Sequence, residues 1–483
     1  MKLKELLSSI DYKEVRGDIN LDIKSISQKT DEENKDGLFF CYSGVNYDGH
    51  NFYQLAENMG AVVLIVEKFL PTKTTQILVE NTRKIIGRVC DKFYNNPTSK
   101  LKIIGISGTN GKTTSSFVLG SVLKKAGFAV GIIGTNGVYI NNKYEPSCLT
   151  TPDSTELYKI FSKMVKNKID WVVMEVSAHA LDLLKVYGIV FECSLFTNLS
   201  HDHLDYFENM ESYAKAKEVL FTKKYSKNCV INSDDNYGLK FFENCDAQKI
   251  LYGIMRPSDC FAINIKMNFS GSSYVVNFKD EIIEIEQALI GKFNIYNVLG
   301  VITVCKILGI KNQVIQQGIK ELKTVKGRFE QVVKKPFDVI VDFAHTPDGL
   351  ANVLKTAKSL TKGKIFCVFG CGGNRDAYKR AKMGLIATKF ANTIIVTSDN
   401  PRFEDPQKII SQITSEIENK SNVFEIVDRT QAITYALSMA CRGDVVLICG
   451  KGAEDYQEIN GISYPFSDKE IVLKYFKKNL ANN

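Results

Sequence analysis

Residues 105–114 read Gly-Ile-Ser-Gly-Thr-Asn-Gly-Lys-Thr-Thr, and this stretch decides the fold. An apolar run at 101–104 precedes it and predicts a buried strand, and 115–125 predicts an amphipathic helix. The glycines allow a tight turn that aims N–H groups at an anion, and the helix N-terminus adds partial positive charge. The stretch therefore predicts a phosphate-binding loop in which Lys112 reaches terminal phosphates and Thr113 holds Mg²⁺, although a glycine-rich turn without a nucleotide is the alternative.

Three domains are expected, because 483 residues are too many for one hydrophobic core. We predict an α/β fold with a small N-terminal α/β domain at 1–98, a central P-loop ATP-binding domain with a parallel sheet at 99–334, and a C-terminal Rossmann-like α/β domain at 335–483. In the two larger domains, short apolar strands alternate with helices, which is typical of a parallel sheet covered on both faces. The predicted strands are 37–42, 61–66, 103–105, 129–133, 171–176, 193–197, 229–231, 338–341, 364–369, 393–397, 423–426 and 445–449.

The composition argues against several classes of protein. With 44% hydrophobic and 24% charged residues, the chain is typical of a soluble globular protein, and we expect neither a signal peptide nor a membrane span. The net charge of +8 comes without a basic tract, which argues against a nucleic-acid partner. The 12 cysteines lack metal-binding spacing and indicate a reducing cytoplasm. Those expected in the core are Cys41, Cys90, Cys193, Cys305 and Cys449.

Acidic and histidine-rich motifs follow two of the central strands. Glu175 ends the apolar run 171–175, and a carboxylate beside a phosphate loop is a suitable Mg²⁺ ligand, with a helix cap or an ion pair as the alternative. The segment 198–205 is rich in histidine and aspartate, and one of its histidines could complete a second magnesium site. The segment 213–221 predicts a helix whose lysines, taken alone, would form a solvated face.

Three motifs in the C-terminal region also follow predicted strands. Asp-Asn-Pro-Arg at 399–402 places Arg402 after a proline turn, where its guanidinium can bind a carboxylate through two hydrogen bonds. A glycine turn with Arg375 occupies 369–376, and Gly-Lys-Gly-Ala-Glu occupies 450–454. Because the carboxyl ends of parallel strands share one edge of a sheet, these motifs predict one pocket that recognises a zwitterion.

Together, these motifs resemble those of the Mur ligase family, which builds the peptide stem of bacterial cell walls. The resemblance extends over essentially the whole chain. The motifs at 150–152, 399–402 and 450–452 are similar to those of the branch that extends UDP-N-acetylmuramoyl-L-alanyl-D-glutamate. The resemblance rests on 108–114, 150–152, 175–179, 198–205, 216–217, 291–297, 327–330, 342–348, 370–376, 399–402 and 450–454.

The resemblance implies an ATP-dependent acid–amino-acid ligase with three domains, which bind the UDP substrate, ATP and an amino acid in that order. It implies an acyl-phosphate intermediate, with ATP and Mg²⁺ as cofactors. The implied role is peptidoglycan precursor synthesis, and hence cell wall biogenesis, cell shape and cell division. The expected partners are UDP-N-acetylmuramoyl-dipeptide and meso-diaminopimelate. We expect a cytoplasmic monomer without nucleic-acid or membrane partners.

The resemblance also assigns residues. The implied catalytic residues are Lys112, Glu175, His203 and Lys217, and the implied metal ligands are Thr113, Glu175, His203 and Lys217 as a carbamate. The implied ATP-binding residues are Gly108, Thr109, Asn110, Gly111, Lys112, Thr113, Thr114, Asn294, Arg328, Asp342 and His345. The implied UDP-substrate residues are Ser27, Asp48, His50, Thr150, Thr151, Ser177 and Lys185. The implied diaminopimelate residues are Arg375, Asn400, Arg402, Gly450 and Glu454.

The identity of the added amino acid depends on Arg402. In the family, Asp-Asn-Pro-Arg is typical of meso-diaminopimelate users, and lysine users lack the arginine. Diaminopimelate has a second carboxylate for Arg402, whereas lysine would leave that cation unpaired. Two alternatives stay open: a related ligase that adds lysine or another amino acid, and a non-catalytic nucleotide-binding paralogue.

Overall fold

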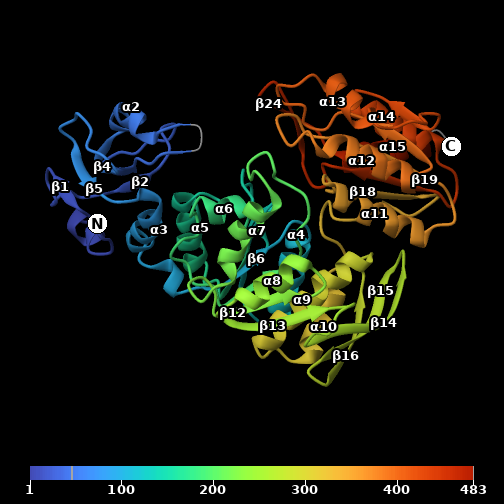
Figure 1. The fold of residues 1–483 in the computed structure, drawn as a ribbon, viewed down its shortest axis with the longest axis horizontal. Helices are drawn as coiled ribbons and strands as arrows, with labels where there is room; N and C mark the ends of the chain where they lie inside the picture. Colours follow the sequence, from blue (N-terminus) through green and yellow to red (C-terminus); the bar gives the residue numbers. More distant parts are fainter. Residues whose placement is uncertain (45–46, 482–483) are drawn as a thin grey trace.

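The computed structural model describes residues 1–44 and 47–481, with side chains as far as Lys478. Three sheets follow one another along the chain, and Figure 1 shows them as a blue N-terminal part, a teal to yellow central part and an orange to red C-terminal part. This is the α/β architecture that we predict from the sequence. No helix among these residues combines the length and apolar character needed to cross a membrane.

The N-terminal sheet has five strands in the order β1-β5-β4-β3-β2. Their bounds are β1 Glu14–Arg16, β5 Thr75–Leu78, β4 Ala61–Val66, β3 Gly37–Phe40 and β2 Ser25–Ser27. Only β1 pairs antiparallel in this sheet. The helices of this part are α1 Leu3–Leu7, α2 Tyr53–Asn58 and α3 Thr82–Phe93, with a 3₁₀ turn η1 Gly49–Phe52.

The central sheet has 11 strands in the order β16-β15-β14-β13-β12-β11-β6-β10-β7-β8-β9. Their bounds are β16 Glu281–Gln287, β15 Gly271–Phe278, β14 Cys260–Asn268, β13 Gln248–Gly253, β12 Asn228–Asn232, β11 Cys193–Phe196, β6 Lys102–Ser107, β10 Trp171–Glu175, β7 Val130–Gly134, β8 Gly137–Ile140 and β9 Lys143–Glu145. From β14 to β7 all neighbours are parallel, but both ends of the sheet are antiparallel. The predicted parallel sheet is therefore confirmed from β14 to β7, and antiparallel strands extend it at both ends, where half-exposed strands such as β16 lack continuous apolar runs.

Helices cover this sheet on both faces. Their bounds are α4 Lys112–Lys125, α5 Ser154–Lys166, α6 Ala178–Asp182, α7 Met210–Glu218, α8 Asn236–Asn244, α9 Lys292–Ile307 and α10 Asn312–Glu321, with 3₁₀ turns η2 Pro97–Ser99 and η3 Val219–Phe221. The prediction that α4 is amphipathic is wrong, because only Lys125 of this helix is exposed. The helix lies between the sheet and the helices α9 and α10, so apolar and small residues surround it.

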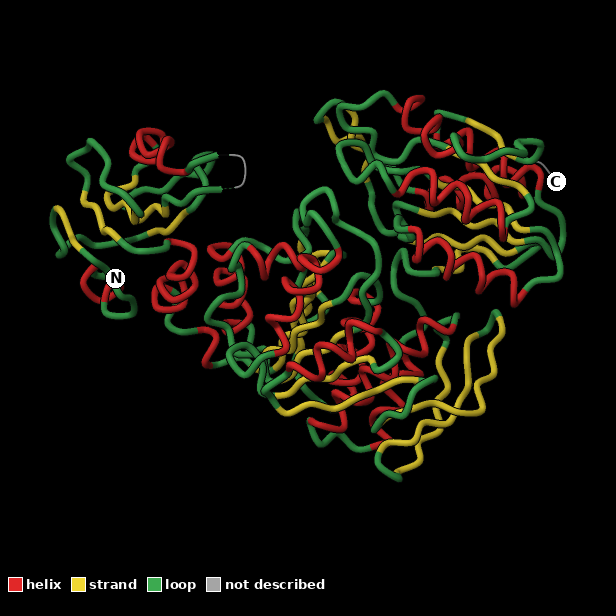
Figure 2. The backbone as a smooth tube through the Cα atoms, in the orientation of Figure 1, coloured by secondary structure: helices red, strands yellow, loops and turns green. Residues whose placement is uncertain are grey.

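The C-terminal sheet has six strands in the order β17-β18-β22-β19-β20-β21, and β17 alone pairs antiparallel. Their bounds are β17 Glu330–Val333, β18 Asp338–Asp342, β22 Val445–Cys449, β19 Ile365–Phe369, β20 Thr393–Val396 and β21 Val423–Glu425, and a hairpin follows with β23 Tyr456–Ile459 and β24 Ile462–Pro465. Helices cover both faces of this sheet (Figure 2). They are α11 Pro347–Leu360, α12 Lys379–Phe390, α13 Pro406–Thr414, α14 Arg429–Met439 and α15 Asp468–Ala481.

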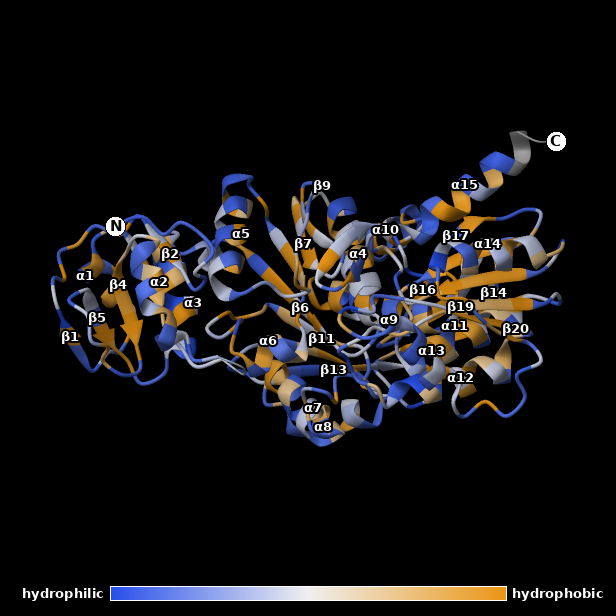
Figure 3. Cartoon of the chain, turned by 90° about the horizontal axis from the view of Figure 1, so that it is seen from above, coloured by the Kyte–Doolittle hydropathy of each residue, from blue (hydrophilic) through white to orange (hydrophobic). Residues whose placement is uncertain are grey.

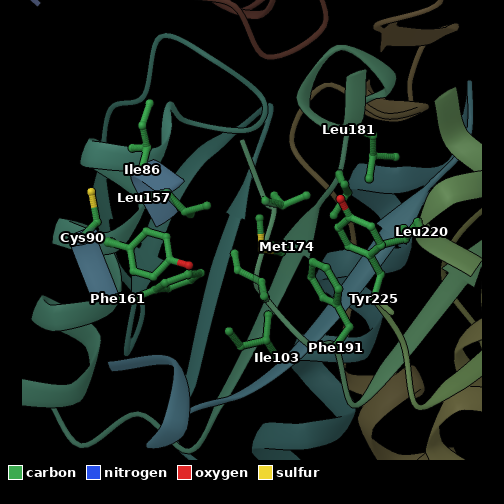
Figure 4. Packing of buried hydrophobic residues seen from close by; sticks show 14 of the residues in the cluster. Ile86, Cys90, Ile103, Leu157, Phe161, Met174, Leu181, Phe191, Leu220 and Tyr225 are labelled. Carbon is green, nitrogen blue, oxygen red and sulfur yellow. The ribbon is translucent and has the colours of Figure 1, made fainter. Parts of the chain in front are cut away.

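Structure continues across both predicted domain boundaries. Strand β17 begins at Glu330, so the C-terminal sheet starts before the predicted boundary at residue 335. Helix α3 contributes Ile86 and Cys90 to a core that also contains Leu157 and Phe161 of α5 (Figure 4). The core thus continues across the predicted boundary at residue 98, and the boundaries themselves stay predictions.

The strands are rich in apolar residues, as the hydropathy colouring in Figure 3 shows. The prediction of buried cysteines is confirmed at all five positions, and all 12 cysteines are free thiols. The two exposed thiols are Cys148, between β9 and α5, and Cys441, between α14 and β22.

Candidate functional site

The sheet topology brings the predicted motifs of the central region together. Strand β6 lies between β11 and β10, and Glu175 at the end of β10 is level with Ile106 of β6. The loops that follow β11, β6 and β10 therefore leave the same edge of the sheet, where parallel α/β sheets bind ligands. Lys112, Glu175 and the segment 198–205 all lie on or beside these loops.

The phosphate loop between β6 and α4 requires glycine at two positions. Gly108 has a φ of 149° and Gly111 a φ of 89°. A Cβ would lie 1.9 Å from Thr197 Oγ1 at Gly108, and 2.2 Å from Asn297 Oδ1 at Gly111. The loop is also held by Asn198, whose Oδ1 accepts a hydrogen bond from Asn110 N at 3.0 Å. This tightly packed turn leads directly into the N-terminus of α4, an arrangement that fits a polyphosphate.

Three cations around this loop donate hydrogen bonds to neutral oxygens. Lys112 Nζ lies 2.9 Å from both Gly108 O and Thr109 O, and Lys217 Nζ lies 3.0 Å from Gly108 O. Arg328 Nη2 donates to Thr113 Oγ1 at 2.8 Å, and its buried Nε has no protein partner among the described residues. Among the described residues, none of these three side chains forms an ion pair with a carboxylate, although Glu175 lies near both Lys112 and Arg328.

Burial changes the titration of these cations. Loss of hydration lowers the pKa of Lys112, and the nearby Glu175 carboxylate partly opposes this effect. Lys217 is 1% exposed, and burial together with the charge of Lys112 holds its pKa well below the ordinary value. The prediction of a solvated lysine face on the helix at 213–221 is therefore wrong for Lys217, because α7 turns this residue toward the phosphate loop.

Glu175 organises the predicted substrate hydroxyls. Its buried carboxylate accepts hydrogen bonds from Thr135 N and Thr135 Oγ1, both at 3.0 Å. Thr135 Oγ1 lies 3.1 Å from Thr150 Oγ1, and Thr151 Oγ1 donates to Glu175 O at 2.9 Å. Ser177 N in turn donates to Thr151 Oγ1 at 3.1 Å. The structure thus brings Thr150, Thr151 and Ser177 to the end of β10.

The histidine-rich segment contains a buried aspartate that the sequence did not single out. Asp202 Oδ2 lies 3.4 Å from His203 Nε2 and 3.7 Å from His345 Nε2, and its Oδ1 lies 3.7 Å from Lys379 Nζ. Burial disfavours the charged form of Asp202, but its contact with His345 and the other positive neighbours outweigh this and hold its pKa well below the ordinary value. Asp202 therefore joins the central region to the loop after β18 and to the start of α12 in the C-terminal region.

His203 has the chemistry of a metal ligand. Its backbone adopts a φ of 56°, which is rare for a residue with a side chain and clusters at functional sites. Its side chain is 42% exposed, and desolvation by the surrounding protein lowers its pKa to about 3. The ring is therefore neutral near pH 7, which is the form that binds metals.

A second contact set lies between the central and C-terminal regions. His201 Nε2 is 3.0 Å from the buried Asp376 Oδ2, and Asn110 Nδ2 is 3.3 Å from Asp348 Oδ2. His345 Nδ1 lies 2.8 Å from Phe343 O, and the carboxylate of Asp342 is used by the backbone N–H groups of Phe329 and Ala344. Asn294 is 1% exposed and bonded to Ile290 and Asn297, so its contact with ATP stays a prediction.

The motifs predicted to form a zwitterion pocket meet at the ends of β20 and β22. Lys451 is fully buried, and its Nζ donates to Asn400 Oδ1 at 2.9 Å and to Glu454 Oε2 at 2.8 Å. Asn400 Nδ2 also donates to Glu454 Oε2, at 3.0 Å. Gly450 has a φ of 114°, and a Cβ there would lie 2.5 Å from Asp399 Oδ2. Arg375 is exposed and lies on the loop that follows β19.

Arg402 is paired with a residue that sequence reasoning missed. Its Nε lies 3.0 Å from Glu458 Oε2, and its Nη1 donates to Gly373 O at 2.9 Å. Glu458 belongs to β23, which lies 56 positions along the chain, and no local sequence signal links the two. Sequence reasoning also missed three individual residues whose contacts lie far along the chain: Lys451, Asp202 and Lys379. Two of them, Lys451 and Asp202, lie within motifs that we singled out.

The predicted UDP-substrate residues of the N-terminal region form hydrogen bonds within the fold. Ser27 Oγ closes a turn by accepting from Lys29 N at 3.0 Å. His50 is 2% exposed, its Nδ1 lies 2.6 Å from Asp48 Oδ1, and its Nε2 accepts from Glu67 N at 3.0 Å. Both ring nitrogens thus serve the fold, and direct contact of His50 with a substrate stays a prediction.

Lys185 lies at the junction of the N-terminal and central regions. Its Nζ is 2.7 Å from Asp153 Oδ1, and both residues line a small recess with Gln28, Tyr42, Arg83 and Leu183. Arg83 of α3 donates to Ser43 O and to Leu183 O, each at 3.3 Å. The recess therefore has two cations and one carboxylate, a composition suited to an anionic ligand.

The metal site needs more than protein carboxylates and histidines. Within the described ranges, no three histidine, cysteine, aspartate or glutamate side chains are grouped to hold a metal ion. Thr113 and Glu175 offer hard oxygen atoms beside the phosphate loop, which suits Mg²⁺, since this ion takes one or two protein carboxylates together with substrate phosphates and water. The residues present therefore fit a phosphate-bound Mg²⁺.

Two family descriptions match the chain. Residues 106–305 match the Mur ligase middle domain, and residues 327–452 match the Mur ligase, glutamate ligase domain. A Clostridium acetobutylicum protein named UDP-N-acetylmuramoyl-L-alanyl-D-glutamate–2,6-diaminopimelate ligase 1 is 43% identical over 99% of this chain and 100% of its own. A solved structure of a UDP-N-acetylmuramoyl-L-alanyl-D-glutamate–2,6-diaminopimelate ligase is similar to this chain, with a TM-score of 0.71 and 28% identity over 99% of both chains. The ADP complex of the MurF ligase from Thermotoga maritima shares the fold, with a TM-score of 0.66 and 17% identity over 95% of this chain and 98% of that one.

Proposed function

The chain belongs to the Mur ligase family, and on this premise we propose that it adds meso-2,6-diaminopimelate to UDP-N-acetylmuramoyl-L-alanyl-D-glutamate in an ATP-dependent reaction. One observation supports the proposed ATP-dependent reaction. Among the described residues, the side chains of Lys112 and Arg328 beside the phosphate loop donate only to uncharged oxygens, and the buried amine of Lys217 lies next to them. Such a site is short of negative charge, and a triphosphate together with a carboxylate would supply it.

In the proposed first step, a glutamyl carboxylate oxygen of the UDP substrate attacks the γ-phosphorus of ATP, and ADP leaves. Two anions must meet, so charge neutralisation is the main requirement. Lys112 would leave the carbonyls of Gly108 and Thr109 for the phosphates. Mg²⁺, held by Thr113, Glu175, His203 and the modified Lys217, would neutralise phosphate charge when bound.

In the proposed second step, the amine of the amino acid attacks the carbonyl carbon of the acyl phosphate. Phosphate leaves, the nitrogen loses a proton, and an amide bond remains. This step needs the acyl phosphate and the amine to be close together. The contacts of Asp202 with His345 and Lys379 join the two regions that would hold these groups, and so does the hydrogen bond from Arg328 to Thr113.

Lys217 is proposed to act as a carbamate. Its lowered pKa favours the neutral amine, and the neutral amine is the form that reacts with CO₂. The product would carry a negative charge next to Lys112, which would relieve the repulsion between the two buried lysines. This modification is supported by the burial of Lys217 and its place beside the loop.

The choice of amino acid is proposed from the C-terminal pocket. Arg402 would bind the distal carboxylate of diaminopimelate, with Arg375, Asn400, Gly450 and Glu454 around the ligand. A lysine-adding ligase and a non-catalytic nucleotide-binding paralogue are the alternatives. Retention of Lys112, Glu175, His203 and Lys217 in one site favours catalysis. The cytoplasmic location and the monomeric state stay predictions.

Phosphate release from ATP tests the proposal. We expect turnover with the UDP-muramoyl-dipeptide and meso-diaminopimelate, and little with L-lysine. Arg402→Ala should raise the KM for diaminopimelate about 100-fold, because a charged two-pronged contact is lost, and should leave the KM for ATP nearly unchanged. Turnover with lysine alone would exclude the proposed substrate, and binding of ATP without turnover with any amino acid would favour the paralogue.

A further inference from the structure

The guanidinium of Arg402 is held from two sides before any ligand arrives. Glu458 Oε2 forms an ion pair with Nε at 3.0 Å, and Gly373 O accepts a hydrogen bond from Nη1 at 2.9 Å. The side chains of Arg402 and Glu458 are 19% and 27% exposed, so this pair is better shielded from water than an ordinary surface ion pair.

Backbone hydrogen bonds fix Glu458 in place. Glu458 N donates to Asn400 Oδ1 at 3.0 Å, and Glu458 O accepts from Arg402 N at 3.1 Å. Asn460 N donates to Arg402 O at 2.7 Å. The hairpin that carries Glu458 is therefore attached to the Asp-Asn-Pro-Arg segment on both sides of the arginine.

Two further features show that this conformation is costly and specifically supported. Arg402 has a φ of 52°, in the left-handed region that residues with a Cβ avoid and that persists where the surroundings enforce it. A Cβ at Gly372 would lie 3.0 Å from Arg402 Nη1, and one at Gly373 would lie 1.9 Å from Pro401 O. The glycine turn after β19 thus makes room for the arginine.

The remaining donors of Arg402 suit a second carboxylate. A guanidinium has five N–H groups. Among the described residues, Gly373 O accepts a hydrogen bond from Nη1 and the Glu458 carboxylate lies beside Nε, so one N–H group on Nη1 and two on Nη2 have no protein acceptor. A carboxylate can bind Nη1 and Nη2 together while Glu458 stays in place.

We infer that Glu458 is a positioning residue for amino-acid selection: it orients Arg402 so that the free Nη1 and Nη2 donors receive the distal carboxylate of the incoming amino acid. This inference rests on the proposed function. It assigns to the hairpin of β23 and β24 a part in specificity, because that hairpin supplies both the carboxylate and the backbone contacts that hold the arginine.

The test is steady-state kinetics of the full-length enzyme and four variants. Glu458→Ala should raise the KM for meso-diaminopimelate roughly tenfold, with kcat and the KM for ATP within about twofold of the wild type. The preference for diaminopimelate over L-lysine should fall by a similar factor. Glu458→Gln keeps an acceptor oxygen for Nε and should recover most of the affinity. Glu470→Ala, which removes an exposed carboxylate of α15, is the matched control and should behave as the wild type.

The outcomes separate the two proposals. If the wild type does not use diaminopimelate, the proposed function fails. If the wild type uses it and Glu458→Ala leaves its KM unchanged or lowers it, Glu458 is a bystander or a competitor for Arg402, and the inference alone is overturned. If the alanine variant does not fold, Glu458→Asp replaces it in the test. This variant keeps the negative charge but has a shorter side chain, so we expect the same rise in the KM for diaminopimelate.

Discussion

The phosphate loop and the C-terminal pocket both contain buried cations, but they compensate them differently. At the loop, Lys112, Lys217 and Arg328 donate to carbonyl and hydroxyl oxygens. In the C-terminal region, the cations are paired: Arg402 with Glu458 at 3.0 Å, Lys451 with Glu454 at 2.8 Å, Arg380 with Glu404 at 2.8 Å, and Arg429 with Asp468 at 2.8 Å.

This difference follows from what each region must bind. An uncompensated group of cations costs stability in the empty protein, and an anionic ligand recovers that cost on binding. A pocket whose charges are already balanced gains little binding affinity from the net charge of a ligand. It instead distinguishes ligands by the positions of their charged groups. The first arrangement suits phosphate chemistry, and the second suits the selection of a zwitterion.

The largest expected effect concerns the unpaired group. Lys112→Met should lower phosphate release about 1,000-fold, because one cation that stabilises the transferring phosphoryl group is removed. It should not lower the free energy of unfolding without ATP, since a poorly compensated charge is also removed. Phosphate release and chemical denaturation measure the two quantities.

Lys125→Met is the matched control for this prediction. Lys125 is on the same helix and forms an exposed ion pair with Glu321. More than a tenth of wild-type turnover in Lys112→Met, or a marked loss of stability, would place Lys112 with the paired cations and break the comparison.

A smaller effect is expected at the most buried pair. Arg429 and Asp468 are both 0% exposed at their side chains, so Asp468→Asn should cost about 3 kcal/mol of unfolding free energy by leaving the arginine uncompensated. Chemical denaturation measures this loss. Glu470→Gln on the same helix should cost less than about 0.5 kcal/mol. Equal losses from the two substitutions would show that pairing in this region contributes nothing to stability.

The smallest effect is a pH dependence. The hydrogen bond from Arg380 lowers the pKa of Glu404 below its ordinary value of 4.5. A carboxylate with a depressed folded pKa contributes stability that is fully present above 4.5 and is lost as the pH falls through the folded value. The stability difference between the wild type and Glu404→Gln should therefore be constant at neutral pH and shrink in acid. A difference that grew on acidification would reverse the assigned sign.

The sequence predicts local features of this molecule well. The strand β6, the glycine turn and helix α4 are consecutive, so hydrophobic periodicity and glycine positions are sufficient to predict them. Three sheets and buried cysteines follow from similar patterns. The antiparallel strands β14, β15 and β16 were missed because their alternating exposure gives no continuous apolar run.

The features that sequence reasoning missed depend on distant contacts. The family resemblance named Lys217, but its burial was not predicted, because it depends on α7 packing over the phosphate loop, 109 positions away in the chain. Glu458 meets Arg402 because a hairpin pairs with a loop, and Asp202 contacts His345 across two sheets. The ligand assignments and domain boundaries remain predictions, since they depend on bound molecules and on motion between regions.

The distribution of thiols has a practical consequence. Ten of the 12 cysteines are shielded inside the protein, whereas Cys148 follows the edge strand β9 of the central sheet and Cys441 precedes β22 of the C-terminal sheet. Maleimide dyes would label these two first. A donor and an acceptor fluorophore at these natural positions would report the distance between the two regions during turnover, without any engineered residue.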